Sequence, residues 1–295
     1  HAALTALAEQ DPLINLRQDD SRQELRLSLY GEVQKEVIQA TLATDFGMRA
    51  GFRESLTIHV ERLLGAGAAA ERMSDPDNPF LATIGLRIEP AAEGSGVAFG
   101  IAAELGSMPL AFFRVVEATV RESFREGLHG WQVTDCAVTM TDTGYLGKHG
   151  LGHQRFNKSM SSTGEDFRGL TPLIVFAALS RAGTVVCEPI DAFALELPAD
   201  CLTAMLAMLA KLRATPGEPL VAGSSCALEG EIPAGQVHYL RQRLLPLTRG
   251  EGMLDAGFSR YRPVAGAAPE RPRTTRSPLE RREYLLEFQH GVRGG

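Results

Sequence analysis

The alternation of apolar and polar residues divides the first part of the chain into short strands and amphipathic helices. Apolar residues alternate with polar ones over 24–30, which predicts a half-buried strand, and they recur at helical spacing over 33–42, which predicts a helix with one apolar face. A helix-like pattern over 2–10 and extended runs over 13–16 and 52–60 surround this pair. Together these elements predict an α+β unit with one sheet and helices on one side of it.

A second set of elements follows a break at 74–79, which contains two prolines and several turn-forming residues. Alternating apolar residues predict strands over 82–88, 97–103 and 133–140. Between them, Pro109 opens a long helix, and its predicted buried face comprises Phe113, Val116, Val120 and Phe124.

Residues 141–169 form the least apolar stretch of this part and are rich in glycine. Loops of this length without structure of their own are uncommon in compact domains and are usually functional or disordered. Thr171 and Pro172 then match the preferences for the start of a helix, and Gly183 matches those for its end. The pattern therefore predicts a functional loop followed by a helix over 171–183.

The last third repeats the α+β style. The patterns predict strands over 190–197 and 253–261, helices over 199–212 and 236–245, and a strand-rich stretch over 221–232. The resulting order, βαββαβ, is typical of a ferredoxin-like fold. Pro246 is expected to end the second helix. A linker rich in proline, alanine and arginine spans 264–275, and a capping box at 277–280 with Pro278 at the first helical position predicts a C-terminal helix.

Charge is unevenly distributed along the chain. The net charge is −6, which is not the basic signature of a free nucleic-acid-binding protein, but residues 241–295 contain 11 arginines and 6 acidic residues. A basic C-terminal end could contact phosphate locally, and an ordinary solvated charged surface explains it equally well.

Several other function classes lack their usual signals. The 4 cysteines are far apart and without a C-x-x-C motif, which disfavours a zinc site or a redox pair. His149 and His153 are separated by glycines that disfavour a metal-binding helix. No apolar run reaches the roughly 18 residues of a membrane span, and we expect no signal peptide. We therefore expect no metal site and no membrane partner.

Ordered strings along the chain carry a family resemblance. The string Leu29-Tyr30-Gly31-Glu32-Val33-Gln34 is followed at family-like spacing by Asn78-Pro79-Phe80, Gly130-Trp131, Asp166-Phe167-Arg168 and Glu188-Pro189. Together they resemble the ribosomal protection proteins that confer tetracycline resistance, relatives of elongation factor G. The resemblance covers essentially the whole chain.

The resemblance implies a fold for each segment. It implies a multidomain α+β protein, with two ferredoxin-like α/β sandwiches flanking a ribosomal-protein S5 domain 2-like domain, plus a C-terminal helix. The expected segments are a ferredoxin-like domain III over 1–66, domain IV over 67–187, a ferredoxin-like domain V over 188–263, and a linker with the C-terminal helix over 264–295.

The resemblance also implies partners and cofactors. Such proteins bind the 70S ribosome, insert domain IV loops at the tetracycline site on 16S rRNA and dislodge the drug, while GTP hydrolysis with Mg²⁺ occurs in an N-terminal domain. This chain has no G-x-x-x-x-G-K-[ST] string and enters a helical pattern at His1, so we expect a part without the GTPase domain and not itself an enzyme. The implied protein is cytoplasmic and monomeric and binds no DNA.

The expected rRNA-contacting loop is Asn157, Lys158, Ser159, Met160, Ser161 and Ser162. The family often has a Tyr-Ser-Pro-Val tip here, from which this chain departs. Two supporting loops are expected at the same end of the domain, around Gly94 and Ser95 and around Gly106 and Ser107. The C-terminal helix is expected to pack beneath them, with Arg281, Arg282 and Arg293 as candidate phosphate contacts. No catalytic or metal-binding residue is expected.

Two alternatives stay open from the sequence. One is a fragment of an elongation factor G-like translocation factor, although the string at 29–33 and the loop at 157–162 differ from those of translocases. The other is a self-contained enzyme with a pocket around 144–169, for which no acid–base pair or nucleophile accompanies the loop.

Overall fold

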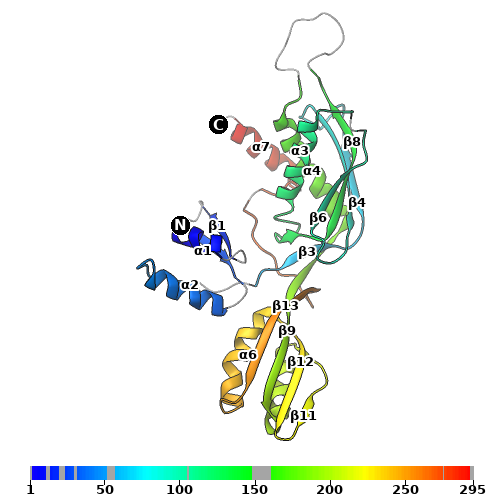
Figure 1. Ribbon diagram of the computed structural model, residues 1–295. Helices are drawn as coiled ribbons and strands as arrows, with labels where there is room; N and C mark the ends of the chain where they lie inside the picture. Colours follow the sequence, from blue (N-terminus) through cyan, green and yellow to red (C-terminus); the bar gives the residue numbers. More distant parts are fainter. Residues whose placement is uncertain are drawn as a thin grey trace, which may run out of the picture. The chain divides into compact units, whose positions relative to one another are not determined.

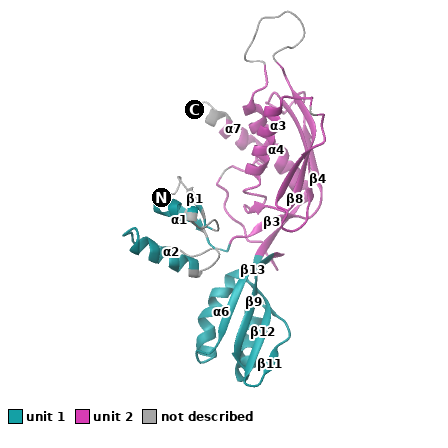
Figure 2. Cartoon of the chain, viewed as in Figure 1, with its two compact units in different colours: residues 1–57, 189–260 teal, residues 58–188, 261–295 magenta. Residues whose placement is uncertain are grey.

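The computed structural model describes residues 2–10, 14–19, 24–29, 32–51, 57–104, 106–147, 161–274 and 276–292. The chain is a mixed α+β protein with several packed parts, as expected (Figure 1). It separates into two compact units, which Figure 2 colours separately. Unit 1 comprises residues 1–57 and 189–260, and unit 2 comprises residues 58–188 and 261–295.

The N-terminal part of unit 1 contains the helices and strands that the hydrophobic pattern predicts. They are α1 (Ala2–Gln10), β1 (Asn15–Asp19), β2 (Glu24–Ser28) and α2 (Glu32–Thr44). β1 and β2 pair antiparallel, and a small core of Ala3, Ile14, Ile38 and Leu42 joins the helices to this hairpin. Residues 52–56 of the predicted third strand lie outside the described residues, so the ferredoxin-like assignment of this segment stays a prediction.

The second part of unit 1 has the predicted ferredoxin-like topology. Its elements are β9 (Thr184–Pro198), α5 (Leu202–Lys211), β10 (Thr215–Pro216), β11 (Leu220–Ala222), β12 (Ser225–Pro233), α6 (Ala234–Leu247) and β13 (Met253–Pro263). β9 pairs with β13 and with β12, and β10 and β11 both pair with β12. The first residues of β9 belong to unit 2, where they pair with β3 (Val60–Leu63).

The end of α6 differs from the prediction. Pro246 lies inside the helix, which continues to Leu247. The backbone N–H and the hydroxyl of Thr248 both donate to the carbonyl of Leu244, at 2.9 and 2.8 Å. These bonds close the last turn, so the proline ring does not terminate it.

Unit 2 is built on a four-stranded sheet. Its strands lie in the order β4 (Gly67–Glu71), β5 (Ala82–Pro90), β8 (Cys136–Tyr145) and β6 (Val97–Ile101). The helices α3 (Leu110–Ser123) and α4 (Gly164–Ala182) pack against it through a shared core. The face predicted for α3 is confirmed, because Phe113, Val116 and Val120 are buried. β4 has no counterpart in the pattern analysis, since GAAAE lacks bulky apolar residues.

The predicted helix start at Thr171 is wrong. α4 begins at Gly164, and its capping box is formed by Thr163 and Asp166. Pro172 lies inside the helix, and the hydroxyl of Thr171 donates to the carbonyl of Phe167 at 2.6 Å. A threonine that bonds four residues back is a known accommodation within helices. The predicted end at Gly183 is confirmed, with a φ of 68° that favours glycine.

The C-terminal segment also begins its helix later than predicted. α7 spans Arg281–Val292, whereas Ser277 and Pro278 lie in a turn in which the N–H of Glu280 donates to the carbonyl of Ser277 at 3.0 Å. Residues 264–274 form a strap without regular structure, as the linker composition indicates.

The buried carboxylate of Glu61 organises the turn on which this strap rests. Glu61 is 0% exposed and accepts hydrogen bonds from the backbone N–H groups of Leu128, His129 and Trp131 at 2.9, 2.8 and 3.0 Å. The hydroxyl of Thr184 donates a fourth bond at 2.7 Å.

The strap then binds the outside of the same turn. The indole N–H of Trp131 donates to the carbonyl of Pro269 at 2.6 Å, and the N–H of Arg271 donates to the carbonyl of His129 at 2.9 Å. The carboxylate of Glu61 therefore joins β3 to this turn and to the start of β9, and the turn in its place binds the strap.

Candidate functional site

Strand β8 defines the two ends of the unit 2 sheet. At one end, Cys136 pairs with Val97 and with Pro90. At the other end, Tyr145 pairs with Ala82. We call these the Cys136 end and the Tyr145 end, and the predicted rRNA loop leaves the sheet from the Tyr145 end.

The loop around Gly106 and Ser107 lies at the Tyr145 end, as expected. The hydroxyls of Ser107 and Thr143 are 2.6 Å apart, two residues before β8 ends. Their contribution to a binding site stays a prediction.

The loop around Gly94 and Ser95 was expected at the same end, and this placement is wrong. It connects β5 to β6 at the Cys136 end, where the N–H of Gly96 donates to the carboxylate of Asp135 at 3.1 Å. Arg62 bridges Asp135 and Glu93 there, at 2.7 and 2.8 Å. The expectation failed because the sequence pattern does not show that β6 runs parallel to β8, which sends this turn to the opposite end.

Residues 72–81 belong to the Tyr145 end, and the sequence analysis missed them. They connect β4 to β5, and Glu71 pairs with Ile84 near the start of β5. The prolines of this segment indicated a break between domains, but the break lies within a hairpin of one sheet. Recognising GAAAE as a strand would have revealed it.

Of the predicted rRNA loop, residues 157–160 lie outside the described residues, and Ser161 and Ser162 lie within them. The side chain of Ser162 is part-buried and bonds within the protein: its hydroxyl accepts from the N–H of Leu146 at 2.7 Å and donates to the carbonyl of Leu81 at 2.5 Å. Ser162 therefore lies at the described base of the loop. Whether the loop contacts rRNA stays a prediction.

Aromatic rings pack directly beneath this base. Phe112 stacks on Phe167 with their centroids 4.5 Å apart, and Tyr145 lies 6.0 Å from Phe112. A Cβ at Gly147 would come within 3.3 Å of the Tyr145 ring. The Tyr145 end is thus a packed platform up to the last described residues of the loop.

The C-terminal helix packs beside this end of the sheet. The hydroxyl of Tyr284 donates to the carbonyl of Gly169 at 3.0 Å, and the ring of Phe288 meets that of Phe80 edge-on at 5.5 Å. Because Phe80 lies in segment 72–81, α7 supports that segment directly.

The three arginines predicted to contact phosphate differ in their surroundings. Arg281 forms two bonds to the carboxylate of Glu71, at 2.9 and 2.7 Å, and donates to the carbonyl of Asp77 at 2.7 Å. The hydrogen bonds to Glu71 raise the pKa of Arg281 above its ordinary value. Arg281 is therefore engaged within the fold, whereas Arg282 is exposed and Arg293 lies outside the described residues.

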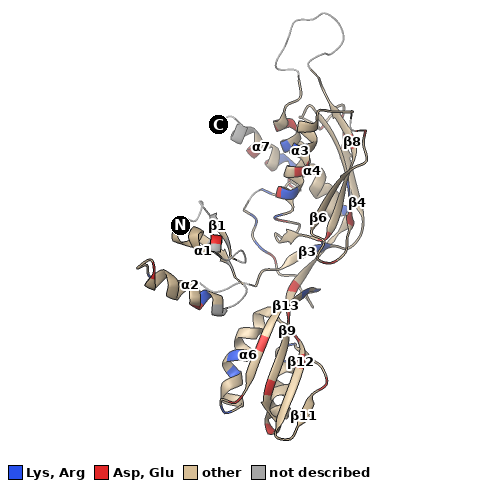
Figure 3. Cartoon of the chain, viewed as in Figure 1, with Lys and Arg blue, Asp and Glu red and all other residues tan. Residues whose placement is uncertain are grey.

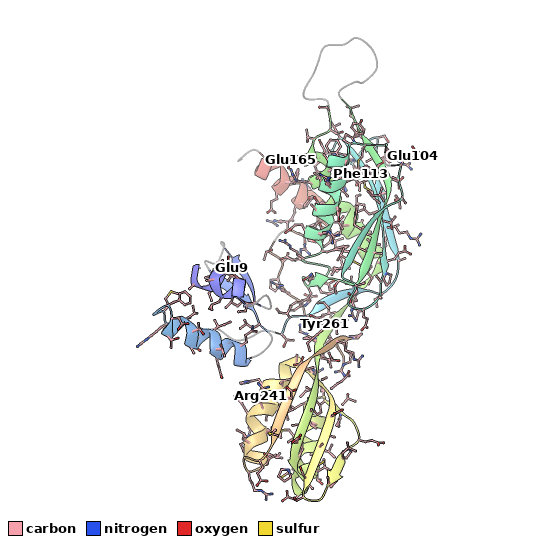
Figure 4. All side chains as sticks on the ribbon, in the orientation of Figure 1. Glu9, Glu104, Phe113, Glu165, Arg241 and Tyr261 are labelled. Atoms are coloured by element: carbon pink, nitrogen blue, oxygen red, sulfur yellow. The ribbon has the colours of Figure 1, made fainter. Side chains whose placement is uncertain are left out.

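The charges at the Tyr145 end have both signs. Figure 3 marks the positions of basic and acidic residues on α3 and α4. Glu104 and Glu165 lie exposed at this end (Figure 4). Glu165 is paired with Arg168.

Within the described part of the chain, no group of three or more histidine, cysteine or acidic side chains is arranged to hold a metal ion. In the same residues, no helix combines the length and the apolar character needed to cross a membrane.

Comparison with known proteins identifies the parts that carry this platform. The family model for elongation factor G domain IV matches residues 67–183, and the model for the elongation factor G C-terminus matches residues 185–272. An oxytetracycline resistance protein of Streptomyces rimosus is 43% identical over 97% of this chain, and tetracycline resistance protein TetM of Streptomyces lividans is 45% identical over 89% of it. Tetracycline resistance protein TetP of Clostridium perfringens is 34% identical over 99% of the chain.

The chain belongs to the elongation factor G-like tetracycline resistance proteins. It spans about two fifths of the length of these relatives, 42%, 39% and 43% respectively. A crystal structure of a protein from Thermus thermophilus has the same fold, with a TM-score of 0.62 at 21% identity, over 98% of this chain and 40% of the other. In this tetracycline resistance family member, the residues matched by the domain IV model carry the whole Tyr145 end.

Proposed function

We propose that this chain is the ribosome-binding part of a tetracycline resistance protein that protects the ribosome, and that the Tyr145 end of unit 2 is its contact with 16S rRNA at the drug site. The observation that carries the proposal is the convergence at this end of the glycine-rich loop base, segment 72–81 and the Ser107 loop. The Phe80–Phe288 contact with α7 supports segment 72–81, and the Phe112–Phe167 stack joins α3 to α4 just after the loop base.

The loop sequence suits an RNA partner. Residues 148–160 contain Lys148, Arg155 and Lys158 and no acidic residue, in a chain whose net charge is −6. Lysine and arginine neutralise backbone phosphates and displace their counterions, which supplies affinity that is sensitive to salt. The rest of the chain is acidic overall, although residues 241–295 are basic, and this net charge limits non-specific attraction to RNA.

The chemistry of the complete protein is divided between this chain and a further domain. GTP hydrolysis with Mg²⁺ would occur in the N-terminal domain implied by the family. This chain would bind the ribosome and displace the drug from its site. As a partner of the ribosome, the protein would act in the cytoplasm, as a monomer.

The test is co-sedimentation of this chain with 70S ribosomes, with and without tetracycline. We expect binding that persists with the drug, and a chain in which 148–160 is replaced by a glycine–serine linker should lose most of it. A chain with the same thirteen residues in scrambled order keeps the charge and serves as the matched control. Equal binding by all three chains would contradict the proposed contact.

Drug retention on the ribosome separates this proposal from a translocation factor. A ribosome-protecting chain should lower the amount of labelled tetracycline that remains on the ribosome. A chain that binds ribosomes and leaves the drug in place would favour the translocation alternative.

A further inference from the structure

The two described ends of the proposed rRNA loop meet at one pair of residues. The N–H of Ser162 donates to the carbonyl of Leu146 at 3.0 Å, and the N–H of Leu146 donates to the hydroxyl of Ser162 at 2.7 Å. The same hydroxyl donates to the carbonyl of Leu81 at 2.5 Å. One hydroxyl therefore joins the end of β8, the start of α4 and the start of β5.

Leu81 is held from its other side as well. Its N–H donates to one carboxylate oxygen of Asp166 at 3.0 Å. The second oxygen of Asp166 accepts from the N–H and the hydroxyl of Thr163, both at 2.8 Å. Because both polar groups of the Leu81 backbone are bonded to the first residues after the loop, segment 72–81 and the loop base form one connected network.

Segment 72–81 is itself braced immediately before Leu81. The side-chain amide of Asn78 donates to the carbonyls of Arg72 and Ala82, both at 3.0 Å, and its oxygen accepts from the N–H of Phe80 at 2.8 Å. The network at Leu81 therefore joins the loop to a segment whose own shape is already fixed.

The role of Ser162 requires a short side chain that accepts one hydrogen bond and donates another. A hydroxyl has this capacity and an alanine methyl has neither function. With alanine at this position, the N–H of Leu146 and the carbonyl of Leu81 would both lose their partner in a part-buried site. The rest of the fold does not depend on this bond, because the cores of β8 and α4 pack elsewhere.

We propose that Ser162 is a positioning residue: it fixes the two ends of the loop against segment 72–81, so that both reach the ribosome in one arrangement. This inference rests on the proposed function, because it assigns to Ser162 the orientation of a contact that other residues make. It replaces the sequence-based expectation that Ser162 itself contacts rRNA.

Amide hydrogen exchange on the free chain tests the structural step. The N–H of Leu146 donates to the Ser162 hydroxyl. Ser162→Ala should therefore lower the protection of the Leu146 N–H against exchange about tenfold, the cost expected when one hydrogen bond is lost. Ser162→Thr keeps the hydroxyl and should retain protection. Ser123→Ala removes a hydroxyl that bonds within α3 at 2.8 Å, and it should leave Leu146 unchanged.

Ribosome binding tests the positioning step. We expect Ser162→Ala to raise the apparent Kd for tetracycline-bound 70S ribosomes about tenfold. We also expect it to weaken the protection of individual 16S rRNA nucleotides against chemical probes. Its unfolding midpoint should fall only by what the lost hydrogen bonds cost, so that the chain stays folded under the assay conditions. Ser162→Thr should restore both the Kd and the protected positions, which a general loss of stability would not explain.

The possible results separate the inference from the proposed function. If Leu146 loses protection in Ser162→Ala while the Kd and the footprint stay at parent values, and the chain with the linker at 148–160 no longer binds, the positioning role is refuted and the loop contact stands. Unchanged protection at Leu146 would refute the inference directly. If the linker chain binds as the parent does, the proposed function fails first.

Discussion

Replacement of Glu61 should expose how strongly one buried carboxylate holds unit 2 together. The side chain is 0% exposed and receives four hydrogen bonds, from Leu128, His129, Trp131 and Thr184. An unsatisfied buried donor costs about 1–3 kcal/mol, and water entering the vacated space would recover part of the sum. We therefore expect Glu61→Ala to lower the free energy of unfolding by about 3–5 kcal/mol.

Glu61→Gln separates the shape of the side chain from its accepting capacity. One carboxylate oxygen accepts from His129 and Trp131, and the other accepts from Leu128 and Thr184. A glutamine oxygen can keep the first pair of bonds, and the Thr184 hydroxyl can turn to accept from the new amide N–H. Only the N–H of Leu128 then loses its acceptor, because it faces the amide nitrogen. The expected loss is about 1–2 kcal/mol.

Denaturant unfolding measures both variants, with fluorescence of Trp131 as the probe. Trp131 is the sole tryptophan, and it lies in the turn that Glu61 holds. Glu89→Ala, which removes an exposed partner of Arg87, is the control and should change stability by less than about 0.5 kcal/mol. A Glu61→Ala chain as stable as the control, or a glutamine variant as damaged as the alanine variant, would refute this account of the turn.

Three further predictions concern the Tyr145 end and the core. Gly169→Ala should lower stability by about 1–3 kcal/mol and expose α7 to limited proteolysis, because its Cβ would lie 2.3 Å from the Phe80 ring; full protection of α7 would contradict the packing. A double-mutant cycle of Arg281 and Glu71 should give a coupling of about 1 kcal/mol, since the pair is bidentate and part-buried, and additivity would show that it contributes nothing. Burial raises the pKa of the Cys136 thiol to about 12, so it should react with a thiol reagent only on unfolding, and rapid reaction in the folded chain would contradict its burial.

Local patterns predicted most of the elements of this fold. The periodicity of α3 is carried by large apolar residues that are buried, and the ferredoxin-like order of unit 1 follows from clear strand and helix patterns. β4 was missed because its buried positions, Gly67 and Ala69, are too small to give a clear apolar alternation. The start of α4 was misplaced because Pro172 resembles a first-turn proline, whereas the capping box at Thr163 was the stronger signal.

The candidate site was predictable only in part, because it depends on strand direction. The sequence indicated a functional loop over 141–169, but both ends of that range belong to regular structure, because β8 continues to Tyr145 and α4 begins at Gly164. It could not show that the turn at Gly94 lies at the Cys136 end, since a parallel partner for β8 is a property of the sheet. Nor could it show that Ser162 bonds to Leu81, which is distant in sequence.

Hydroxyl-radical probing from single tethered positions tests the central claim, that the Tyr145 end is the ribosome contact. The four native cysteines are buried, so a cysteine introduced at Ser161 or at Gly94 can carry the iron chelate selectively. On tetracycline-bound 70S ribosomes, cleavage of 16S rRNA beside the drug site should arise from position 161 and not from position 94. Cleavage there from position 94 alone, or from neither position while the chain remains bound, would contradict it.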